Sequence, residues 1–178
     1  MDKIKDIKLF FWMGSFFAIP IIGWVIVVIL ADPYNYFNIS HVFSDNSKEM
    51  SSKQTNTLLY NVLEFSSSPK SKVFIGDSRI KTFKSDEALE FFHLYSNAAK
   101  LNEMIDLFWF ADSCIKLEEV YIGVNFNLYN KYAYSNRMSA VSAILKNPLL
   151  YVFNSSIVEA TWALIKVDFF DKIINNKP

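Results

Sequence analysis

Cysteine and histidine are both scarce in this chain of 178 residues, which contains one cysteine and two histidines. A single cysteine, Cys114, excludes an internal disulfide framework, and without basic neighbours it is expected to pack as a small apolar side chain rather than react as a thiolate. His41 and His93 are far apart and lack the spacing of metal ligands, so we expect no structural metal site. No motif requires a cofactor, and none is expected.

A surplus of positive charge is also missing, because eighteen basic residues balance eighteen acidic ones. Proteins that bind nucleic acids need clustered positive charge to neutralise phosphates, so we expect no nucleic-acid partner. The phosphate-binding patterns Gly-x-Gly-x-x-Gly and Gly-Lys-Ser/Thr do not follow the first predicted strand, which makes a nucleotide-binding domain the weakest functional interpretation. By contrast, hydrophobic residues make up 52% of the chain, which is enough for a folded core.

A long apolar run occupies residues 9–31 and carries no charged side chain. About 20 apolar residues are enough for a helix to cross the hydrocarbon layer. Three lysines precede the run, whereas the next basic residue after it is Lys48. By the positive-inside rule, residues 1–8 form a cytoplasmic tail, and the domain lies on the extracytoplasmic side of a cytoplasmic membrane. A cleaved signal peptide is the alternative, but its apolar core is normally about 7–15 residues long, and no small-x-small pattern ends this run.

The segment after the anchor, residues 32–57, is predicted to connect it to the globular domain. Pro33 ends the apolar helix, because proline disfavours helical geometry in the residue before it. Tyr34, Tyr36 and Phe37 are residue types that favour the lipid–water interface, so we expect an aromatic belt at the membrane surface. Most of the remaining positions are polar and rich in Ser, Asn and Lys, as is typical of a connection.

Three short apolar runs, at residues 72–76, 91–95 and 119–125, predict buried β-strands. Residues 101–115 have apolar side chains at helical spacing and predict an amphipathic helix that covers one face of the sheet. The order strand, helix, strand indicates βαβ units, in which the strands are parallel and the crossovers are right-handed. The polar residues at the carboxyl ends of all three strands would then lie along one rim.

Further helices are predicted on either side of these strands. Residues 58–65 and 138–145 show helical spacing, and a short helix is also expected after the first strand. An Asn-Pro pair at residues 147–148 ends one helix, and Ser-x-x-Glu at residues 156–159 resembles a capping box that opens another, which reaches about residue 174. Charged residues interrupt this last helix, so it is not predicted to be a second membrane span.

The three strand ends resemble the first three sequence blocks of the SGNH (GDSL-type) hydrolase superfamily. The matching residues are Gly-Asp-Ser at 76–78, Ser-Asn-Ala-Ala at 96–99 and Gly-Val-Asn at 123–125. Asp-Pro-Tyr at 32–34 and Asn-Phe-Asn-Leu-Tyr-Asn at 125–130 are similar to the membrane-anchored bacterial branch that contains DltD and the alginate-acetylation proteins. Proteins of that branch act in the acylation or deacylation of cell-envelope polymers.

The resemblance implies a three-layer, flavodoxin-like parallel sheet behind one transmembrane helix, with residues 58–178 forming an SGNH-like α/β domain. It implies that Ser78 is the nucleophile of an esterase or O-acyltransferase. An amide near Ala98 and the side chain of Asn125 would belong to the oxyanion hole. Asp77 is expected to give structural support, as an acceptor that holds the turn after the first strand. The implied partners are the membrane, an envelope glycan and a membrane-bound acyltransferase.

Two departures from the family pattern bear on activity. Residues 98–99 are Ala-Ala where the family has glycine, whose missing side chain permits close backbone approach. The family's Asp-x-x-His is missing, since residues 168–171 are Asp-Phe-Phe-Asp, and His93 lies within a predicted strand, short of its carboxyl end. Three strands are predicted where a doubly wound domain has about five. The chain is therefore expected to be a C-terminally truncated and inactive form of such an enzyme.

A non-catalytic membrane-anchored module is the second hypothesis. In this case the same rim binds a glycan or a membrane acyltransferase through the asparagines and aromatic residues Asn97, Asn125, Asn127, Tyr129 and Tyr132. Binding would survive Ser78→Ala, whereas the enzymatic hypothesis predicts that this substitution abolishes esterase activity. Arg79 could also bind a carboxylate or phosphate, although an arginine that braces a turn is more common.

Overall fold

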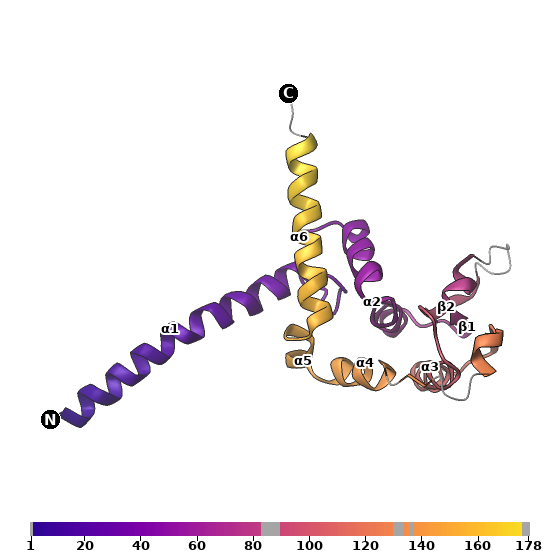
Figure 1. Cartoon of the computed structure of the whole chain (residues 1–178), viewed down its shortest axis with the longest axis horizontal. Helices are drawn as coiled ribbons and strands as arrows, with labels where there is room; N and C mark the ends of the chain where they lie inside the picture. The colour runs from indigo at the N-terminus through magenta and orange to yellow at the C-terminus, as the bar shows by residue number, and fades with distance from the viewer. Residues whose placement is uncertain (1, 83–89, 130–133, 136, 176–178) are drawn as a thin grey trace.

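The computed structural model describes residues 2–82, 90–129, 134–135 and 137–175. It has a mixed α/β fold with a small parallel sheet and a long N-terminal helix that projects from the body (Figure 1). The elements in chain order are α1 (Asp2–Ala31), α2 (Asp45–Ser67), β1 (Lys72–Asp77), the 3₁₀ helix η1 (Ser78–Thr82), β2 (Phe92–Ser96), α3 (Leu101–Cys114), β3 (Glu119–Ile122), the 3₁₀ helix η3 (Phe126–Tyr129), α4 (Arg137–Lys146), α5 (Pro148–Val152) and α6 (Ser155–Asn175).

The three strands form one parallel sheet, as the βαβ pattern predicts, and the structure gives their order as β2-β1-β3. Val73 of β1 lies opposite Phe92 on one side and Val120 on the other, so β1 is the central strand. β2 begins and ends one residue later than predicted, and β3 ends at Ile122, three residues early. Because the strands are parallel, their carboxyl ends share one rim of the sheet.

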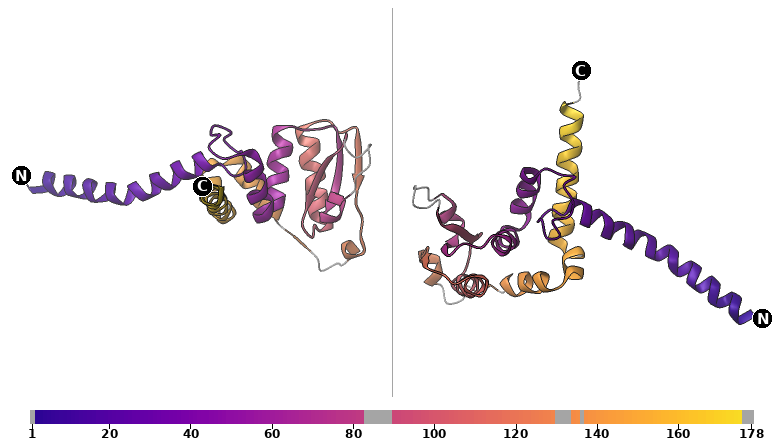
Figure 2. Two further views of the ribbon diagram at one scale, coloured as in Figure 1. Left: turned by 90° about the horizontal axis from the view of Figure 1, so that it is seen from above. Right: turned by 180° about the vertical axis from the view of Figure 1, so that it is seen from behind.

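One face of the sheet is covered by α2 and α3, which lie side by side (Figure 2). Val73 and Ile75 point to this face and are fully buried. Phe65 of α2 lies 5.0 Å from Phe92 of β2 and 6.1 Å from Phe110 of α3, measured between ring centroids. The prediction of an amphipathic helix that covers a sheet face is confirmed by α3.

The opposite face carries Phe74 of β1, with His93 of β2 and Tyr121 of β3 beside it. The rings of His93 and Tyr121 lie 5.8 and 6.1 Å from that of Phe74, and Tyr121 remains 55% exposed. Among the described residues, η1 contributes the cover of this face, through Ile80, which packs over Gly76. The described part of the chain is thus a sheet with its long helices on one face, and the three-layer arrangement stays a prediction.

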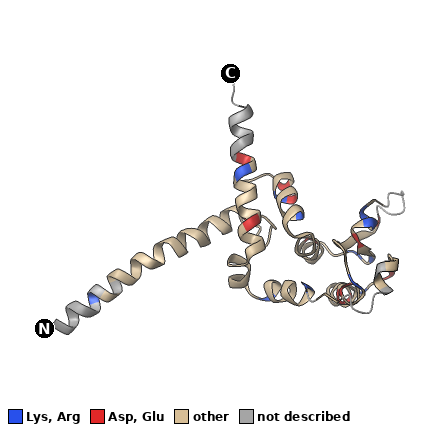
Figure 3. Ribbon diagram, viewed as in Figure 1, with Lys and Arg blue, Asp and Glu red and all other residues tan. Residues whose placement is uncertain are grey.

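α1 contains a segment, Trp12–Ala31, that is long and apolar enough to cross a membrane: it has 20 residues and a mean hydropathy of 2.5. Between Lys8 and Asp32 the helix carries no charged side chain (Figure 3). Most of its side chains are exposed along this length. Its last turns differ, because Val28 and Ala31 are buried against α5 and α6.

The turn that follows α1 is built around Asp32, which is fully buried. Its carboxylate accepts hydrogen bonds of 2.8–3.0 Å from the backbone N–H groups of Tyr36, Phe37 and Asn38. It also accepts a bond of 2.9 Å from the hydroxyl of Tyr151. Burial and the neighbouring Asp32 charge raise the pKa of Tyr151 far above its ordinary value, so this hydroxyl stays protonated and remains a donor.

The aromatic side chains after α1 pack against the domain instead of forming the expected belt. Tyr34 is buried, with 4% of its surface exposed. Tyr36 stacks on Tyr151 with ring centroids 4.4 Å apart, and Phe37 meets the edge of the same ring at 5.4 Å. The prediction of an aromatic belt at the membrane surface is therefore wrong for Tyr34, because the turn at Asp32 directs this side chain into the core.

The stretch at residues 32–57 is also more regular than the predicted connection. α2 begins at Asp45, where Ser44 caps its first turn, and continues to Ser67. It bends at Asn56, whose backbone angles are not helical. The helix predicted at residues 58–65 is the second half of this longer, bent helix.

Polar contacts hold the first half of α2 against the turn after α1. Lys48 is 1% exposed, and its ammonium donates to the side chain of Asn35 at 2.8 Å and to the carbonyl of Ser40 at 3.0 Å. Ser52, which is fully buried, donates to the carbonyl of Pro33. We call the cluster formed by Asp32, Tyr36, Lys48, Ser52 and Tyr151 the junction.

The last three helices pack beside the junction. α4 and α5 are separated at Asn147, as predicted, and the Asn147 side chain accepts a bond of 3.0 Å from the N–H of Leu149. α6 begins at Ser155, and the Asn154 side chain accepts a bond of 2.9 Å from the N–H of Ser156. The prediction that Ser156 opens a capping box is wrong, because Asn154 caps the helix two residues earlier.

Candidate functional site

The four site residues predicted from the sequence meet in one pocket at the rim of the sheet. This pocket, which we call the rim pocket, has a volume of about 200 Å³ and is lined by Asp77, Ser78, Arg79, Ala98, Ala99, Lys100 and Asn125. The lining comes from the end of β1, the loop after β2 and the segment after β3. Parallel strands bring these three segments together because all their carboxyl ends lie on the same side.

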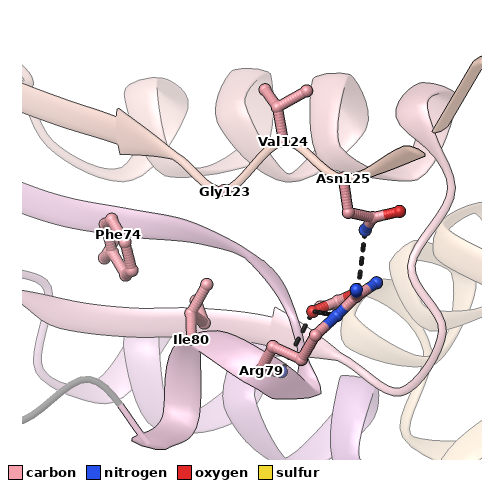
Figure 4. A pocket seen from close by; sticks show the side chains of 7 residues that line it. Phe74, Arg79, Ile80, Gly123, Val124 and Asn125 are labelled. Carbon is pink, nitrogen blue, oxygen red and sulfur yellow. Dashed lines mark hydrogen bonds and ion pairs between the residues drawn. The ribbon is translucent and has the colours of Figure 1, made fainter. Parts of the chain in front are cut away.

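Asp77 is the hub of the polar contacts beside the rim pocket. Its carboxylate, 6% exposed, accepts hydrogen bonds from the backbone N–H of Arg79 at 3.0 Å and from the Arg79 Nε at 2.9 Å. It also accepts a bond of 2.8 Å from the side-chain amide of Asn125 (Figure 4). The hydrogen bonds from the Arg79 guanidinium lower the pKa of Asp77, although burial opposes the shift. Asp77 therefore ties β1 to the segment after β3 as an anion.

Close backbone approach sets the position of the turn that carries Ser78. A Cβ atom added to Gly76 would lie 2.6 Å from the Cγ2 methyl of Ile80, and one added to Gly123 would lie 2.8 Å from the same methyl. Both contacts are too short for real atoms, so the two glycines allow η1 to lie directly on the sheet. The first residue of η1 is Ser78.

A second pocket lies on the other side of the Asp77–Arg79 pair. It has a volume of about 220 Å³ and is lined by Phe74, Asp77, Arg79, Ile80, Gly123, Val124 and Asn125 (Figure 4). Asp77, Arg79 and Asn125 line both pockets, so the ion pair separates a polar cavity from a more apolar one. The expectation that Arg79 braces the turn agrees with its bonds to Asp77.

Ser78 is exposed at the mouth of the rim pocket. Within the part of the chain that the structure describes, its hydroxyl has no hydrogen-bond partner. His93 does not reach it, because its ring lies against Phe74 on the face of the sheet. His41 is exposed in the segment before α2, and Asp168 lies on α6, so neither lines this pocket. The described residues that line this pocket with Ser78 include no histidine.

Ala98 has a φ of 52°, in the left-handed region that side chains other than glycine rarely adopt. This is one of the two positions where the resembled family has glycine. The neighbouring Ala99 donates from its N–H to the carbonyl of Ser96 at 3.3 Å, which closes the turn after β2. The chain thus adopts at Ala98 a conformation that favours glycine and accepts some backbone strain.

A partly buried ion pair that the sequence pattern did not reveal holds the loop after β2. Arg137 of α4 donates to both carboxylate oxygens of Glu103, which is fully buried on α3, at 2.8 and 2.9 Å. The same guanidinium donates to the carbonyl of Asn97 at 3.1 Å. The Asn97 side chain donates to Thr57 at 3.1 Å and lines a neighbouring pocket of about 210 Å³. Asn97 is therefore outside the rim pocket.

Other residues singled out from the sequence lie elsewhere. Asn127 and Tyr129 belong to η3, and Tyr132 lies outside the described residues. Cys114 ends α3 and is exposed, so the prediction that it packs as an apolar side chain is wrong. Across the described residues, no three His, Cys, Asp or Glu side chains gather as a metal site would require.

Lys100 is the lining residue that sequence reasoning missed. It directly precedes α3 and follows the Ser-Asn-Ala-Ala block, so its position after a predicted strand end was the available signal. Comparison with known proteins adds no relative: no family model, no curated protein and no solved structure matches this chain.

Proposed function

We propose that this chain is a membrane-anchored, SGNH-like protein whose rim pocket takes an acyl ester of a cell-envelope glycan, with Ser78 as the attacking group. The observation that supports this is the position of Ser78. Its exposed hydroxyl lies just past the central strand, in a pocket shared with the backbone at Ala98 and the side chain of Asn125. α1 would supply the anchor.

The reaction would be acyl transfer to serine. The Ser78 oxygen bonds to the ester carbonyl carbon, the bond from that carbon to the sugar oxygen breaks, and the serine proton passes through a base to the departing sugar hydroxyl. Donors aimed at the developing oxyanion contribute about 10²–10³ in rate each. The proposed donors are the N–H of Ser78, an N–H near Ala98 and the amide of Asn125.

A histidine base is the missing part. Among the described lining residues of the rim pocket there is a lysine but no histidine. A serine hydroxyl is a weak nucleophile without a base, so we infer that turnover by this chain is very slow. Imidazole in solution should replace the absent side chain, because the pocket is open at Ser78.

The test mixes the full chain, in detergent micelles, with phenyl acetate as the acyl donor and with increasing concentrations of imidazole. We expect an acetyl adduct on Ser78, detected by mass spectrometry, that grows with imidazole concentration. Ser78→Ala should show no adduct, whereas Ser113→Ala, which changes an exposed serine on α3, should react as the unaltered chain does. Equal adduct on the unaltered chain and Ser78→Ala would contradict the proposal.

The second candidate is a binding module that uses the same pocket without chemistry. It is favoured by one observation: the Asn125 amide already donates to Asp77, which builds a rigid polar rim. We expect O-acetylated oligosaccharides to bind Ser78→Ala as well as the unaltered chain and to bind Asn125→Ala more weakly, as measured by calorimetry. Loss of binding in both variants, together with the acetyl adduct, would favour the enzyme.

The proposed location is the cytoplasmic membrane, with the domain outside. Cys114 offers a direct test, because it is the one cysteine of the chain and is exposed. A maleimide that does not cross membranes should label Cys114 in intact spheroplasts and should not label Cys114→Ser. Labelling that requires lysis of the spheroplasts would place the domain in the cytoplasm instead.

A further inference from the structure

Large apolar side chains are exposed where α5 meets α6. Leu149, Leu150 and Phe153 are 66%, 47% and 54% exposed, and Trp162 of α6 is 52% exposed. Single exposed apolar residues are ordinary, but a group of four around one short helix marks a contact surface. We call these four residues the α5 patch.

The α5 patch is continuous with the apolar surface of α1. The indole N–H of Trp24 donates to the carbonyl of Val152 at 3.1 Å, and the Trp24 ring stacks on Trp162 with centroids 6.4 Å apart. Trp24 precedes Ala31, the end of α1, by seven residues, which is about 10 Å along a helix. The last turn of α5 therefore lies beside α1 within its membrane-spanning segment, not beyond its end.

The arrangement of the helices also places α5 at the level of the membrane-spanning segment of α1. α6 runs across α1 rather than along it, and the α/β body lies on the far side of α6 from the N-terminus of α1 (Figures 1 and 2). When α1 crosses a membrane, the N-terminal part of α6, next to α5, then lies at the membrane surface. α5 then lies level with Trp24 of α1, nearer to the membrane than the α/β body.

The side chains of α6 suit such a position. Val158, Trp162 and Ile165 are three or four residues apart and share one face. Glu159 and Lys166 lie along one edge of this face and are exposed. Apolar residues with charges at their edge are typical of a helix in the interface, where a lysine can extend its ammonium to the headgroups.

We propose that α5 and the first half of α6 insert into the headgroup region of the leaflet at the C-terminal end of α1, so that the protein has a second, interfacial contact with the same bilayer. The bilayer is the occupant because the α5 patch continues the surface of the spanning helix. Helices suit this depth because their backbone groups are satisfied internally, and Trp24 satisfies the terminal carbonyl of Val152. This inference rests on the membrane anchor of the proposed function, not on the chemistry of Ser78.

The experiment measures the depth of spin labels on the full chain in liposomes of phosphatidylcholine and phosphatidylglycerol. Cys114→Ser removes the native thiol, and single cysteines are introduced by Leu149→Cys or Phe153→Cys. Two exposed helix positions provide references: Ile26→Cys on α1 for lipid, and Ile105→Cys on α3 for water. Collisions with oxygen, which concentrates in lipid, are compared with collisions with a water-soluble nickel chelate.

We expect the labels at 149 and 153 to resemble the label at 26, with a high ratio of oxygen to chelate collisions, and to differ from the label at 105. Chelate collisions at 149 and 153 equal to those at 105, with residue 26 in lipid, would overturn the inference and leave the anchor intact. Protection of 149 and 153 from both reagents would also overturn it, because a protein partner would then cover the patch. Chelate access at residue 26 would overturn both the inference and the proposed anchor.

Discussion

The junction and the rim pocket are each centred on an aspartate at the end of an apolar segment, but the two aspartates have different partners. Asp32 is fully buried and accepts hydrogen bonds from three backbone N–H groups and one hydroxyl. Asp77 is also buried, with 6% of its surface exposed, but the side chain of its main partner, Arg79, is 63% exposed. At the junction, the polar groups are engaged in hydrogen bonds that hold the turn after α1. At the rim, the hydroxyl of Ser78 and the backbone at the strained Ala98 could contact a ligand in the pocket.

The largest effect is expected at the junction. Asp32→Asn keeps the shape of the side chain but presents an amide NH₂ to groups that themselves donate. We expect it to lower the free energy of unfolding by about 2–4 kcal/mol, because hydrogen bonds to a buried charge are lost and donors remain unpaired. Thermal unfolding in detergent micelles, followed by circular dichroism, measures the loss.

Tyr151→Phe is the matched control, since it removes one of the four donors and leaves the carboxylate in place. It should cost clearly less than Asp32→Asn. Equal stability of Asp32→Asn and the unaltered chain would show that the junction is no better ordered than the rim.

A smaller effect is expected beneath the rim pocket. Gly76→Ala places a Cβ against Ile80 and should lower the free energy of unfolding by about 1–3 kcal/mol, as overpacking generally does. It should also displace η1 and reduce the imidazole-dependent adduct on Ser78. A double-mutant cycle with Ile80→Ala tests the cause, because removing the methyl relieves the clash. Additive costs in the double variant would argue against this contact.

A gain is expected at Ala98. Ala98→Gly relieves the left-handed strain and should raise the free energy of unfolding by about 1 kcal/mol, less the greater entropy of glycine in the unfolded chain. Ala99→Gly, where no positive φ is present, is the control and should destabilise. The unfolding temperatures of the two variants are compared with that of the unaltered chain. A loss of stability in Ala98→Gly would mean that the turn is unstrained.

The smallest effect concerns pH. Because the folded pKa of Asp77 is lowered, its contribution to stability is present above the unfolded pKa of about 3.9 and is lost as the pH falls through the lower folded value. Arg79→Gln should raise the folded pKa and weaken this acid-range dependence of the unfolding temperature. Salt should mask the difference, because Arg79 is exposed. Lys81→Gln, an exposed neighbour, should leave the profile unchanged.

The sequence predicted the elements that follow from local patterns. Periodicity located the three strands and α3, and the βαβ order predicted the parallel sheet, so the meeting of Asp77, Ser78 and Asn125 at one rim could be anticipated. The first half of α2 could not, because its buried positions include Lys48 and Ser52, which no search for apolar periodicity selects. Their partners, in the turn after α1, depend on the tertiary fold.

The same limit applies to the candidate site. Strand ends can be read from a sequence, so residues directly after them are found. The Arg137–Glu103 pair was not found, because 34 positions separate its members and each is unremarkable alone. The positions of Tyr34 and Cys114 were predicted wrongly for a related reason. Residue type suggested a surface position for Tyr34 and a core position for Cys114, whereas the path of the chain buries the first and exposes the second.

The junction has a mechanical consequence for the proposed membrane anchor. A flexible tether would let the domain tumble and search a volume set by the tether length. Here α1, the proposed anchor, is joined to the body through the contacts of Asp32, Lys48 and Tyr151. The rim pocket would then stand at one height above the lipid and face one direction. With the proposed function, the pocket would reach ester groups at that distance from the lipid and would not reach the same groups nearer to or farther from the membrane.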